Sequence, residues 1–366
     1  MTTETEPAAQ TTGTPTGETS VEEFLGRVAG DAATVFHAAT VLLGDKLGLY
    51  KALAAAGPVT ASELAERTAC DARYLQEWLH AQVASHYCEH DPATGRFSLT
   101  PAQATVLADE TSPAFAAGMM ALAAAVLKDE ERLGRDAVRT GAGVGWHEHH
   151  PDLFSGTERL FKPGYVTNLV SSWIPALDGV EAKLRAGARV ADIGCGHGAS
   201  TIVLAQAYPD CEVHGFDYHS ASIEVARRRA VEAGVSNRAR FEVAGADDFS
   251  GDGYDLVCVF DALHDMGDPV GAAHHVRETL ADDGTFLIVE PMAGESLEEN
   301  TNVLGRLFYS AGMFICLAHA KSQGGVQQLG PQVPEATWRE LLLEAGFTRF
   351  RRATETPFNR VFEARA

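Results

Sequence analysis

The sequence predicts an α/β protein, with a doubly wound, mostly parallel sheet over residues 181–366 that follows a smaller, mainly helical domain. Two observations predict this class. Short apolar runs alternate with helix-forming segments from about Leu184 onward, which is the pattern of successive strand–helix–strand units. Glycines at every second position, from Gly194 to Gly198, follow the first apolar run, where such a sheet turns from a strand into a helix. A length of 366 residues suits two domains.

Composition limits the class of partner. The chain is 45% hydrophobic and 22% charged, with a formal net charge of −21. This charge disfavours nucleic acid and anionic membranes, because affinity for both comes largely from Lys and Arg. No apolar run looks long enough to span a bilayer. The six cysteines form no CxxC pair, which favours reduced thiols and a cytoplasmic location.

The N-terminal residues predict a tail followed by a compact helical domain. Residues 1–20 are rich in Thr, Glu, Pro and Gly and lack the basic and apolar regions of a signal peptide, so we expect a disordered tail. Ser20 and Glu23 form a capping box that opens a helix to about Thr40. Two shorter helices and an alternating segment with a turn, Tyr87–Leu99, then complete a winged-helix pattern over residues 21–110.

The winged helix has two possible uses, DNA binding or dimerisation. The candidate recognition helix carries Asp71, Arg73 and Glu77, and its surroundings are also acidic. A DNA-binding face needs to be basic, so dimerisation is favoured.

Residues 111–180 are predicted to be mostly helical, linking the two domains and contributing to a substrate pocket. Met119, Tyr165 and Trp173 are candidate pocket residues, although ordinary helix packing explains each equally well. The run Trp146–His150 lacks the HExxH spacing of a zinc site and is interpreted as a surface loop or cofactor lid. No metal is expected.

The remaining residues predict seven strands. Five strands are expected first, with helices between them, and two more follow the helical regions 297–320 and 334–345. The predicted strands lie near 188–193, 211–216, 239–244, 254–260, 284–290, 347–354 and 359–364.

The glycine-rich turn predicts a cofactor that contains a nucleoside. Glycines let a ligand approach the backbone at a helix N-terminus, and Asp217, at the end of the next apolar run, is placed to hold a ribose. The same glycines fit a dinucleotide site, but Asp192, two residues before Gly194, would repel a pyrophosphate. S-adenosylmethionine (SAM) has no phosphate and carries a cationic sulfonium. Asp192 therefore favours SAM.

These residues resemble the first motif of class I SAM-dependent methyltransferases, and the terminal strand pair resembles the reversed last strand of their Rossmann-like, seven-stranded sheet. The winged helix is similar to the dimerisation domain of small-molecule O-methyltransferases. The resemblance implies that the protein is a homodimer. It also implies that Asp217 holds the ribose hydroxyls of SAM. Asp248 is an alternative to Asp247 for the adenine contact, because Gly245 and Ala246 stand where the family often has an aspartate. The implied cofactor residues are Asp192, Gly194, Cys195, Gly196, Asp217, Tyr218, Ala246, Asp247 and Phe260.

The segment Phe260–Pro269 resembles the Leu-His-Asp-Trp-x-Asp stretch of the same family, whose histidine is the general base. This role would fall to His264, because imidazole titrates near neutral pH and a hydroxyl must lose its proton to attack well. Glu290 matches the acidic residue that orients this histidine. A buried structural role remains an alternative for each.

The sequence therefore predicts a methyltransferase that transfers the methyl group of SAM to a small organic acceptor, most readily to a hydroxyl oxygen. Phe308, Met313 and Phe314 are further candidates for an apolar acceptor pocket, although core packing would give the same spacing. Two alternatives stay open. One is a winged-helix transcriptional regulator that binds SAM, and the other is an enzyme of this fold that uses SAM without methyl transfer.

Overall fold

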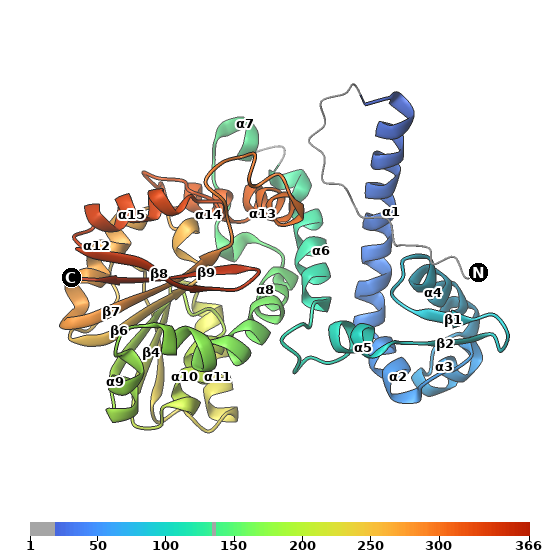
Figure 1. The fold of residues 1–366 in the computed structure, drawn as a ribbon, viewed down its shortest axis with the longest axis horizontal. Helices are drawn as coiled ribbons and strands as arrows, with labels where there is room; N and C mark the ends of the chain where they lie inside the picture. The colour runs from blue at the N-terminus through green and yellow to red at the C-terminus, as the bar shows by residue number, and fades with distance from the viewer. Residues whose placement is uncertain (1–18, 134–136) are drawn as a thin grey trace, which may run out of the picture.

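The computed structural model describes residues 19–133 and 137–366. The predicted disordered tail, 1–20, therefore lies outside the described residues except for its last two. A helical part that begins with the long helix α1 stands beside a larger part built on a twisted sheet (Figure 1). The predicted fold class is confirmed. The domain boundaries at residues 20, 110 and 180 stay a prediction.

The N-terminal part is a bundle of helices with a two-stranded wing. Ser20 caps α1, since its hydroxyl accepts from the Glu23 amide and the Glu23 carboxylate accepts from the Ser20 amide. The first helix ends at Lys46 rather than near Thr40, because the apolar residues after Thr40 continue it into the core. The elements are α1 (Val21–Lys46), α2 (Leu49–Ala56), α3 (Ala61–Thr68), α4 (Ala72–Ala84), β1 (Glu89–Asp91), β2 (Arg96–Ser98) and α5 (Pro101–Leu107).

The middle of the chain connects the two parts through helices. His150 caps α8, and Pro151 occupies the first turn of this helix, where its missing amide hydrogen costs no hydrogen bond. Pro163 lies inside α8 and lacks an amide hydrogen, and a π-helix follows directly. The elements are α6 (Ala117–Arg132), α7 (Val138–Thr140), η2 (Trp146–Glu148), α8 (Pro151–Gly164), the π-helix η3 (Tyr165–Trp173) and η4 (Ile174–Ala176).

The C-terminal part is a seven-stranded sheet in the order β5-β4-β3-β6-β7-β9-β8. The first five strands are parallel, and β9 runs antiparallel to both β7 and β8, as the predicted terminal pair required. The chain order reverses between β3 and β6, which is where such sheets bind ligands. The strands are β3 (Arg189–Ile193), β4 (Glu212–Asp217), β5 (Ala239–Val243), β6 (Tyr254–Phe260), β7 (Leu280–Pro291), β8 (Arg349–Glu355) and β9 (Asn359–Arg365).

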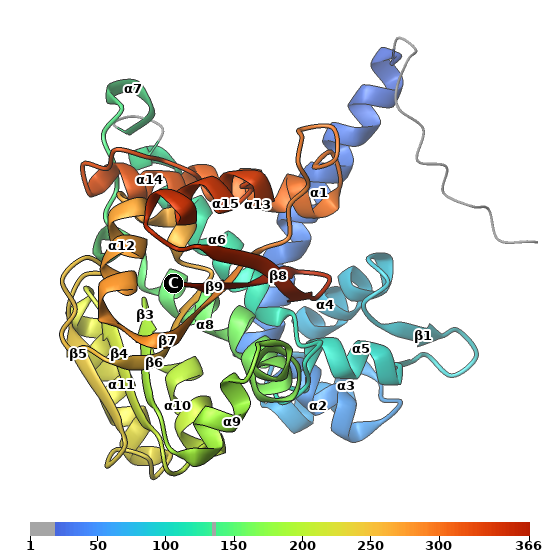
Figure 2. The ribbon, with the colours of Figure 1, turned by 60° about the vertical axis from the view of Figure 1, so that its left-hand side comes forward.

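Two apolar clusters lie on the two faces of this sheet. Figure 2 shows helices on both sides of the sheet. Residues of α9, α10 and α11 pack with one face, and residues of α12 and α15 pack with the other. The helices are α9 (Val180–Ala186), α10 (Ala199–Ala207), α11 (Ser220–Glu232), the short η5 (Leu263–Asp265), α12 (Pro269–Thr279), α13 (Val303–Phe314), α14 (Cys316–Ser322) and α15 (Glu335–Glu344).

One helical region differs from the expectation that no run could span a bilayer. Val303–Ser322 has 20 residues and reaches the length and apolar composition of a membrane span, with 33% of its most apolar window buried in the protein. It bends at Ile315, where α13 ends and α14 begins. Here α13 packs on α6 and α14 packs on η5.

An ion pair between α1 and α8 predicts a contribution to stability. Arg159 donates two hydrogen bonds to Asp45, of 2.6 and 2.8 Å, and the Asp45 side chain is only 9% exposed. We expect Asp45→Ala to lower the free energy of unfolding by about 1–3 kcal/mol, measured by urea denaturation.

The matched control is Asp31→Ala, whose pair with Arg306 is exposed on both sides and should contribute less than about 1 kcal/mol. Equal effects of the two variants would contradict the argument that burial makes the Asp45 pair important.

Candidate cofactor and active site

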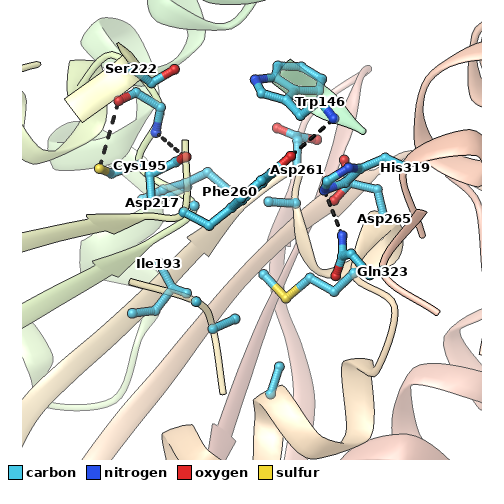
Figure 3. A pocket seen from close by; sticks show the side chains of 18 of the residues that line it. Trp146, Ile193, Cys195, Asp217, Ser222, Phe260, Asp261, Asp265, His319 and Gln323 are labelled. Carbon is cyan, nitrogen blue, oxygen red and sulfur yellow. Dashed lines mark hydrogen bonds between the residues drawn. The ribbon is translucent and has the colours of Figure 1, made fainter. Parts of the chain in front are cut away.

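A cavity of about 680 Å³ lies at the carboxyl ends of β3, β4 and β6 (Figure 3). Its floor is the glycine-rich loop after β3. Gly194, Gly196 and Gly198 all have positive φ angles, of 70°, 52° and 77°, which other residues rarely adopt. A side chain at Gly198 would place its Cβ 2.7 Å from the Phe241 ring. The loop therefore needs glycine for its backbone shape and, at Gly198, also for close packing.

Asp217 ends β4 and joins this loop to the cavity wall. Its Oδ2 accepts from the Gly196 amide at 2.9 Å and its Oδ1 accepts from the His219 amide at 2.8 Å. Burial raises the pKa of Asp217 above its usual value, although both amide hydrogen bonds oppose the shift. The carboxylate lines the cavity where the sequence places the ribose contact.

Asp192 is placed differently from the expectation of a direct cofactor contact. It is 1% exposed, does not line the cavity, and its Oδ2 accepts from the hydroxyls of Ser200 and Thr201, each at 2.6 Å. Burial raises the pKa of Asp192 to about 6. Asp192 thus ties the end of β3 to the first turn of α10, and its predicted contact with the methionine part stays a prediction.

The other predicted cofactor residues come together around the cavity. Asp248 accepts from the Gly245 amide at 2.7 Å and is absent from the lining, whereas Asp247 lines the cavity, and the predicted adenine contact stays a prediction. The predicted residues that line the cavity are Gly194, Cys195, Gly196, Asp217, Tyr218, Ala246, Asp247 and Phe260.

Further carboxylates line the same cavity, among them Asp261 and Asp265, which have no predicted role. Asp261 has a positive φ of 50°, and one of its oxygens accepts from Asn359 at 2.8 Å while the other has no partner within the described residues. Burial raises the pKa of Asp261 well above its usual value and that of Asp265 to about 7. Together with Asp217, these groups make the cavity suited to a cation. Both aspartates lie in the segment Phe260–Asp265, which also contains the predicted base His264.

His264 and Glu290 form a buried pair beside the cavity. His264 Nδ1 lies 2.6 Å from Glu290 Oε2, and the two residues are 3% and 0% exposed. Burial alone would lower the pKa of His264, but the neighbouring Glu290 carboxylate and Cys316 raise it well above its ordinary value. Neither residue lines the cavity, whereas the adjacent Asp265 does.

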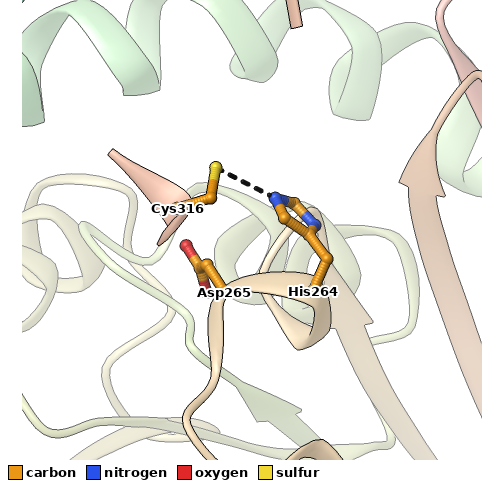
Figure 4. Close-up of side chains that lie close together, drawn as sticks. All are labelled: His264, Asp265 and Cys316. Carbon is orange, nitrogen blue, oxygen red and sulfur yellow. Dashed lines mark hydrogen bonds between the residues drawn. The ribbon is translucent and has the colours of Figure 1, made fainter. Parts of the chain in front are cut away.

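The other ring nitrogen of His264 is also occupied. Its Nε2 lies 3.3 Å from the sulfur of Cys316, at the start of α14 (Figure 4). Ligand atoms of His264, Asp265 and Cys316 lie within 4.8 Å of one another, a set of donor types that zinc accepts. No sequence signal pointed to Cys316, because it is 52 residues from the histidine.

The predicted substrate residues are mostly placed elsewhere. Tyr165 lines the cavity, but Met119, Trp173, Phe308, Met313 and Phe314 are absent from its lining. Trp173 is buried in the core that packs on the sheet, and Met313 is 46% exposed. Helical spacing shows which residues share a face, but not whether that face turns toward the cavity.

Other aromatic side chains line the cavity instead of these predicted substrate residues. Trp146 donates its amide hydrogen to Tyr218 Oη at 3.1 Å, and the Tyr218 ring stacks on His319 at 5.4 Å. Burial lowers the pKa of His319 to about 4, so this ring is neutral at pH 7. Trp146, Tyr218 and His319 all line the cavity, with Phe154 and Phe161 beside them. Of this group, the sequence identified the Trp146 segment as a candidate lid and Tyr218 as a cofactor contact.

The family comparisons agree with this architecture. Residues 184–338 match the family described as "Methyltransferase domain", and residues 36–109 match the "Rv2258c-like winged HTH domain". The chain thus contains a methyltransferase domain preceded by a winged helix-turn-helix domain, and its predicted resemblance to class I SAM-dependent methyltransferases is confirmed. With the acidic cavity and its glycine loop, these matches identify SAM as the cofactor.

Two relatives match part of the chain. The chain is 35% identical over 130 residues to an uncharacterised methyltransferase, YcgJ, of Bacillus subtilis, covering 34% of this chain and 50% of YcgJ. It is 30% identical over 169 residues to the 27-O-demethylrifamycin SV methyltransferase of Amycolatopsis mediterranei, covering 44% of this chain and 57% of that protein. The chain thus spans about half the length of these relatives.

Solved structures share the whole fold at low identity. A putative O-methyltransferase from Nostoc punctiforme has a TM-score of 0.70 at 17% identity, covering 95% of this chain and 99% of that one. Human N-acetylserotonin methyltransferase, solved with SAM, has a TM-score of 0.66 at 19% identity, with coverages of 96% and 99%. The mitomycin 7-O-methyltransferase MmcR has a TM-score of 0.68 at 20% identity, with coverages of 94% and 98%.

The Asp217 carboxylate predicts a loss of cofactor affinity on substitution. We expect Asp217→Ala to weaken SAM binding by about 30-fold or more, because a hydrogen bond to a charged group contributes roughly 2 kcal/mol. Calorimetric titration measures this loss. Asp248→Ala, which removes a nearby carboxylate outside the cavity, serves as the control and should change the affinity less than about threefold. Similar losses in both variants would count against a direct ribose contact.

The raised pKa of Asp265 predicts a pH dependence. With its pKa at about 7, Asp265 is mostly neutral at pH 5.5 and mostly ionised at pH 8. A cationic sulfonium should therefore bind more tightly as the pH rises through 7. The ratio of SAM affinity to S-adenosylhomocysteine affinity isolates this charge and should increase from pH 5.5 to 8, measured by calorimetry. Asp265→Asn should flatten the profile, and a flat wild-type profile would refute the argument.

Proposed function

We propose that the chain is a SAM-dependent methyltransferase that methylates a hydroxyl oxygen of a small organic molecule. The observation that carries this proposal is the buried His264–Glu290 pair beside a cavity whose residues fit SAM. Structural neighbours that are named as O-methyltransferases support the same chemistry.

In this mechanism, bound SAM supplies an electrophilic methyl group on a cationic sulfur. Asp217 holds the ribose, and Asp261 and Asp265 favour the positive charge. In its neutral form, His264 accepts the proton of the acceptor hydroxyl at Nε2, while Glu290 stabilises the resulting imidazolium through Nδ1. Because the pKa of His264 is raised, this neutral form becomes more populated as the pH rises. Cys316 must release Nε2 before the acceptor can reach it.

The acceptor is proposed to be partly apolar and aromatic. Trp146, Phe154, Phe161, Tyr165 and Phe260 all line the cavity, and large rings of this kind favour flat apolar ligands. The charged groups of the cavity are carboxylates, so an anionic acceptor would be repelled.

The winged helix is proposed to hold two copies of the chain together. Apolar side chains of α1, including Phe24 at 60% and Phe36 at 78%, are exposed in the single chain, as expected of an unpaired interface. In α4, Arg73 pairs with Glu77 at the helix surface, which leaves little positive charge for DNA. We therefore propose a homodimer that binds neither nucleic acid nor membrane. Six free cysteines suit a cytoplasmic protein.

Removing the imidazole tests the proposed base. We expect His264→Gln to lower kcat by about 10²- to 10⁴-fold with SAM affinity unchanged, because general base catalysis contributes that factor. Rates are measured as S-adenosylhomocysteine released with an acceptor from a phenol library. A decrease below threefold would remove His264 from the mechanism. Turnover without S-adenosylhomocysteine would instead favour an enzyme that uses SAM without methyl transfer.

Charges on α1 test the proposed dimer. Val35→Glu with Phe36→Glu should convert the dimer to a monomer in analytical ultracentrifugation, because two carboxylates would be buried in the interface. The control is Leu343→Glu, at an exposed apolar position of α15 away from α1. A monomeric wild-type protein would disprove the dimer.

A further inference from the structure

The charged groups that line the cavity match only part of SAM. Within the described residues, the lining holds six carboxyl groups and neither lysine nor arginine. These groups suit the sulfonium and the ammonium of SAM, but they repel its carboxylate. A cavity that binds SAM therefore needs a local partner for this one anion. The six groups belong to Glu158, Asp217, Asp247, Asp261, Asp265 and Asp268.

Two histidines line the cavity, and their surroundings differ. The ring of His319 stacks on Tyr218, and its Nε2 lies 2.7 Å from the amide nitrogen of Gln323. Burial lowers the pKa of His319 to about 4, so this ring adds no positive charge at pH 7. His197 lies in the glycine-rich loop after β3, and its side chain is 14% exposed. Among the lining residues that the structure describes, His197 is thus the one that can supply a cation.

Glu158 of α8 fixes the orientation of the His197 ring. Nδ1 of His197 lies 3.0 Å from Oε2 of Glu158, and a carboxylate accepts, so Nδ1 carries the hydrogen of this bond. Oε1 of Glu158 pairs with Arg229 of α11. Burial would raise the pKa of Glu158, but the bonds from His197 and Arg229 lower it, so Glu158 is ionised. Nε2 of His197 has no hydrogen-bond partner within residues 19–133 and 137–366.

We propose that His197 binds the carboxylate of the methionine part of SAM through Nε2, and that Glu158 positions the ring for this contact. A ring between two carboxylates donates from both nitrogens, so His197 is an imidazolium in the complex, with its second ring proton taken from solvent. Arg229 balances the charge of Glu158, which leaves the charge of His197 for the cofactor. Asp217 also lies near the ring, but its oxygens accept from two backbone amides.

The loop around His197 suits an anion. The helix α10 begins at Ala199, and its N-cap, Gly198, offers no side-chain hydrogen bond to the first turn. Helix N-termini favour negative charge, because their first amide groups lack partners within the helix. Ala199 lines the cavity, so this end of the helix is open to a ligand. The predicted methionine contacts, Gly194 to Gly196, directly precede His197 in the same loop.

The test uses two ligands that differ only in the carboxylate. S-adenosylhomocysteine carries it without a charge on sulfur, and S-adenosyl-3-thiopropylamine has hydrogen in its place. The acidic lining alone would favour the thiopropylamine, whose net charge is more positive. We expect the wild-type chain to bind S-adenosylhomocysteine at least about tenfold more tightly in calorimetric titration, because hydrogen bonds between charged groups are among the strong ones.

Three variants locate the effect. His197→Gln keeps a polar side chain without the charge, and His197 has no positive φ that would make the loop sensitive to the exchange. Its affinity for S-adenosylhomocysteine should fall about 10- to 100-fold, and its affinity for the thiopropylamine less than about threefold. Glu158→Gln should also reduce the preference, whereas a merely structural loss would weaken both ligands equally. The control is His274→Gln, which breaks an exposed pair with Glu278 outside the cavity and should change neither affinity.

Three results would overturn the proposal: a wild-type preference for the thiopropylamine, an unchanged preference in His197→Gln, or equal losses of both ligands in that variant. If the variant fails to fold, the nitrogen chemical shifts of His197 in the wild-type complex with S-adenosylhomocysteine decide the matter. Both ring nitrogens should carry a proton there, and a neutral ring would refute the contact. The proposal concerns cofactor binding alone, so the expected preference in a chain that methylates no acceptor would support His197 while counting against the proposed function.

Discussion

The carboxylates buried at the carboxyl edge of the sheet are the constraint on which the rest of the site depends. Asp217, at the end of β4, accepts hydrogen bonds from two backbone amides, one of them in the glycine loop after β3. These bonds hold the loop in a fixed position relative to β4. Asp192, in β3, accepts hydrogen bonds from the hydroxyls of Ser200 and Thr201 and so connects the strand before the loop to the first turn of α10. Burial raises the pKa of Asp192 and of Asp217, because it makes the ionised form of each carboxyl group less favourable. A nearby cationic ligand would stabilise these ionised forms.

Much of the fold could be predicted because its signals are local. Each predicted strand of the large sheet is present, and its ends differ from the prediction by at most a few residues. Strands could be predicted because an apolar run and the glycine turn after it consist of residues that are adjacent in the sequence. Asp217 and the glycines could be predicted for the same reason, because strand ends in a parallel sheet meet at one edge. The end of α1 was predicted too early because apolar residues continue that helix without a breaking residue.

The parts that could not be predicted depend on how elements are rotated and packed. None of the aromatic residues of α13 lines the cavity, and no spacing in the sequence reports which side of a helix faces a cavity. The contact between Cys316 and His264 joins α14 to η5 through packing alone. Asp261 lines the cavity and has a left-handed backbone conformation, which aspartate adopts more readily than most residues, but nothing in the sequence marks which aspartate will adopt it.

The acidic cavity and the buried base impose an order on the proposed reaction. The carboxylates that are ionised in the cavity would repel an acceptor that arrived already ionised, so the acceptor has to enter as a neutral hydroxyl. Its proton must then be removed inside the cavity, which needs a base that is itself held in place without solvent. Glu290 supplies that support to His264 from β7, a central strand whose position is fixed by pairing on both sides. The same negative charge that holds the cofactor thus explains why the base lies deep in the protein and not at the cavity mouth.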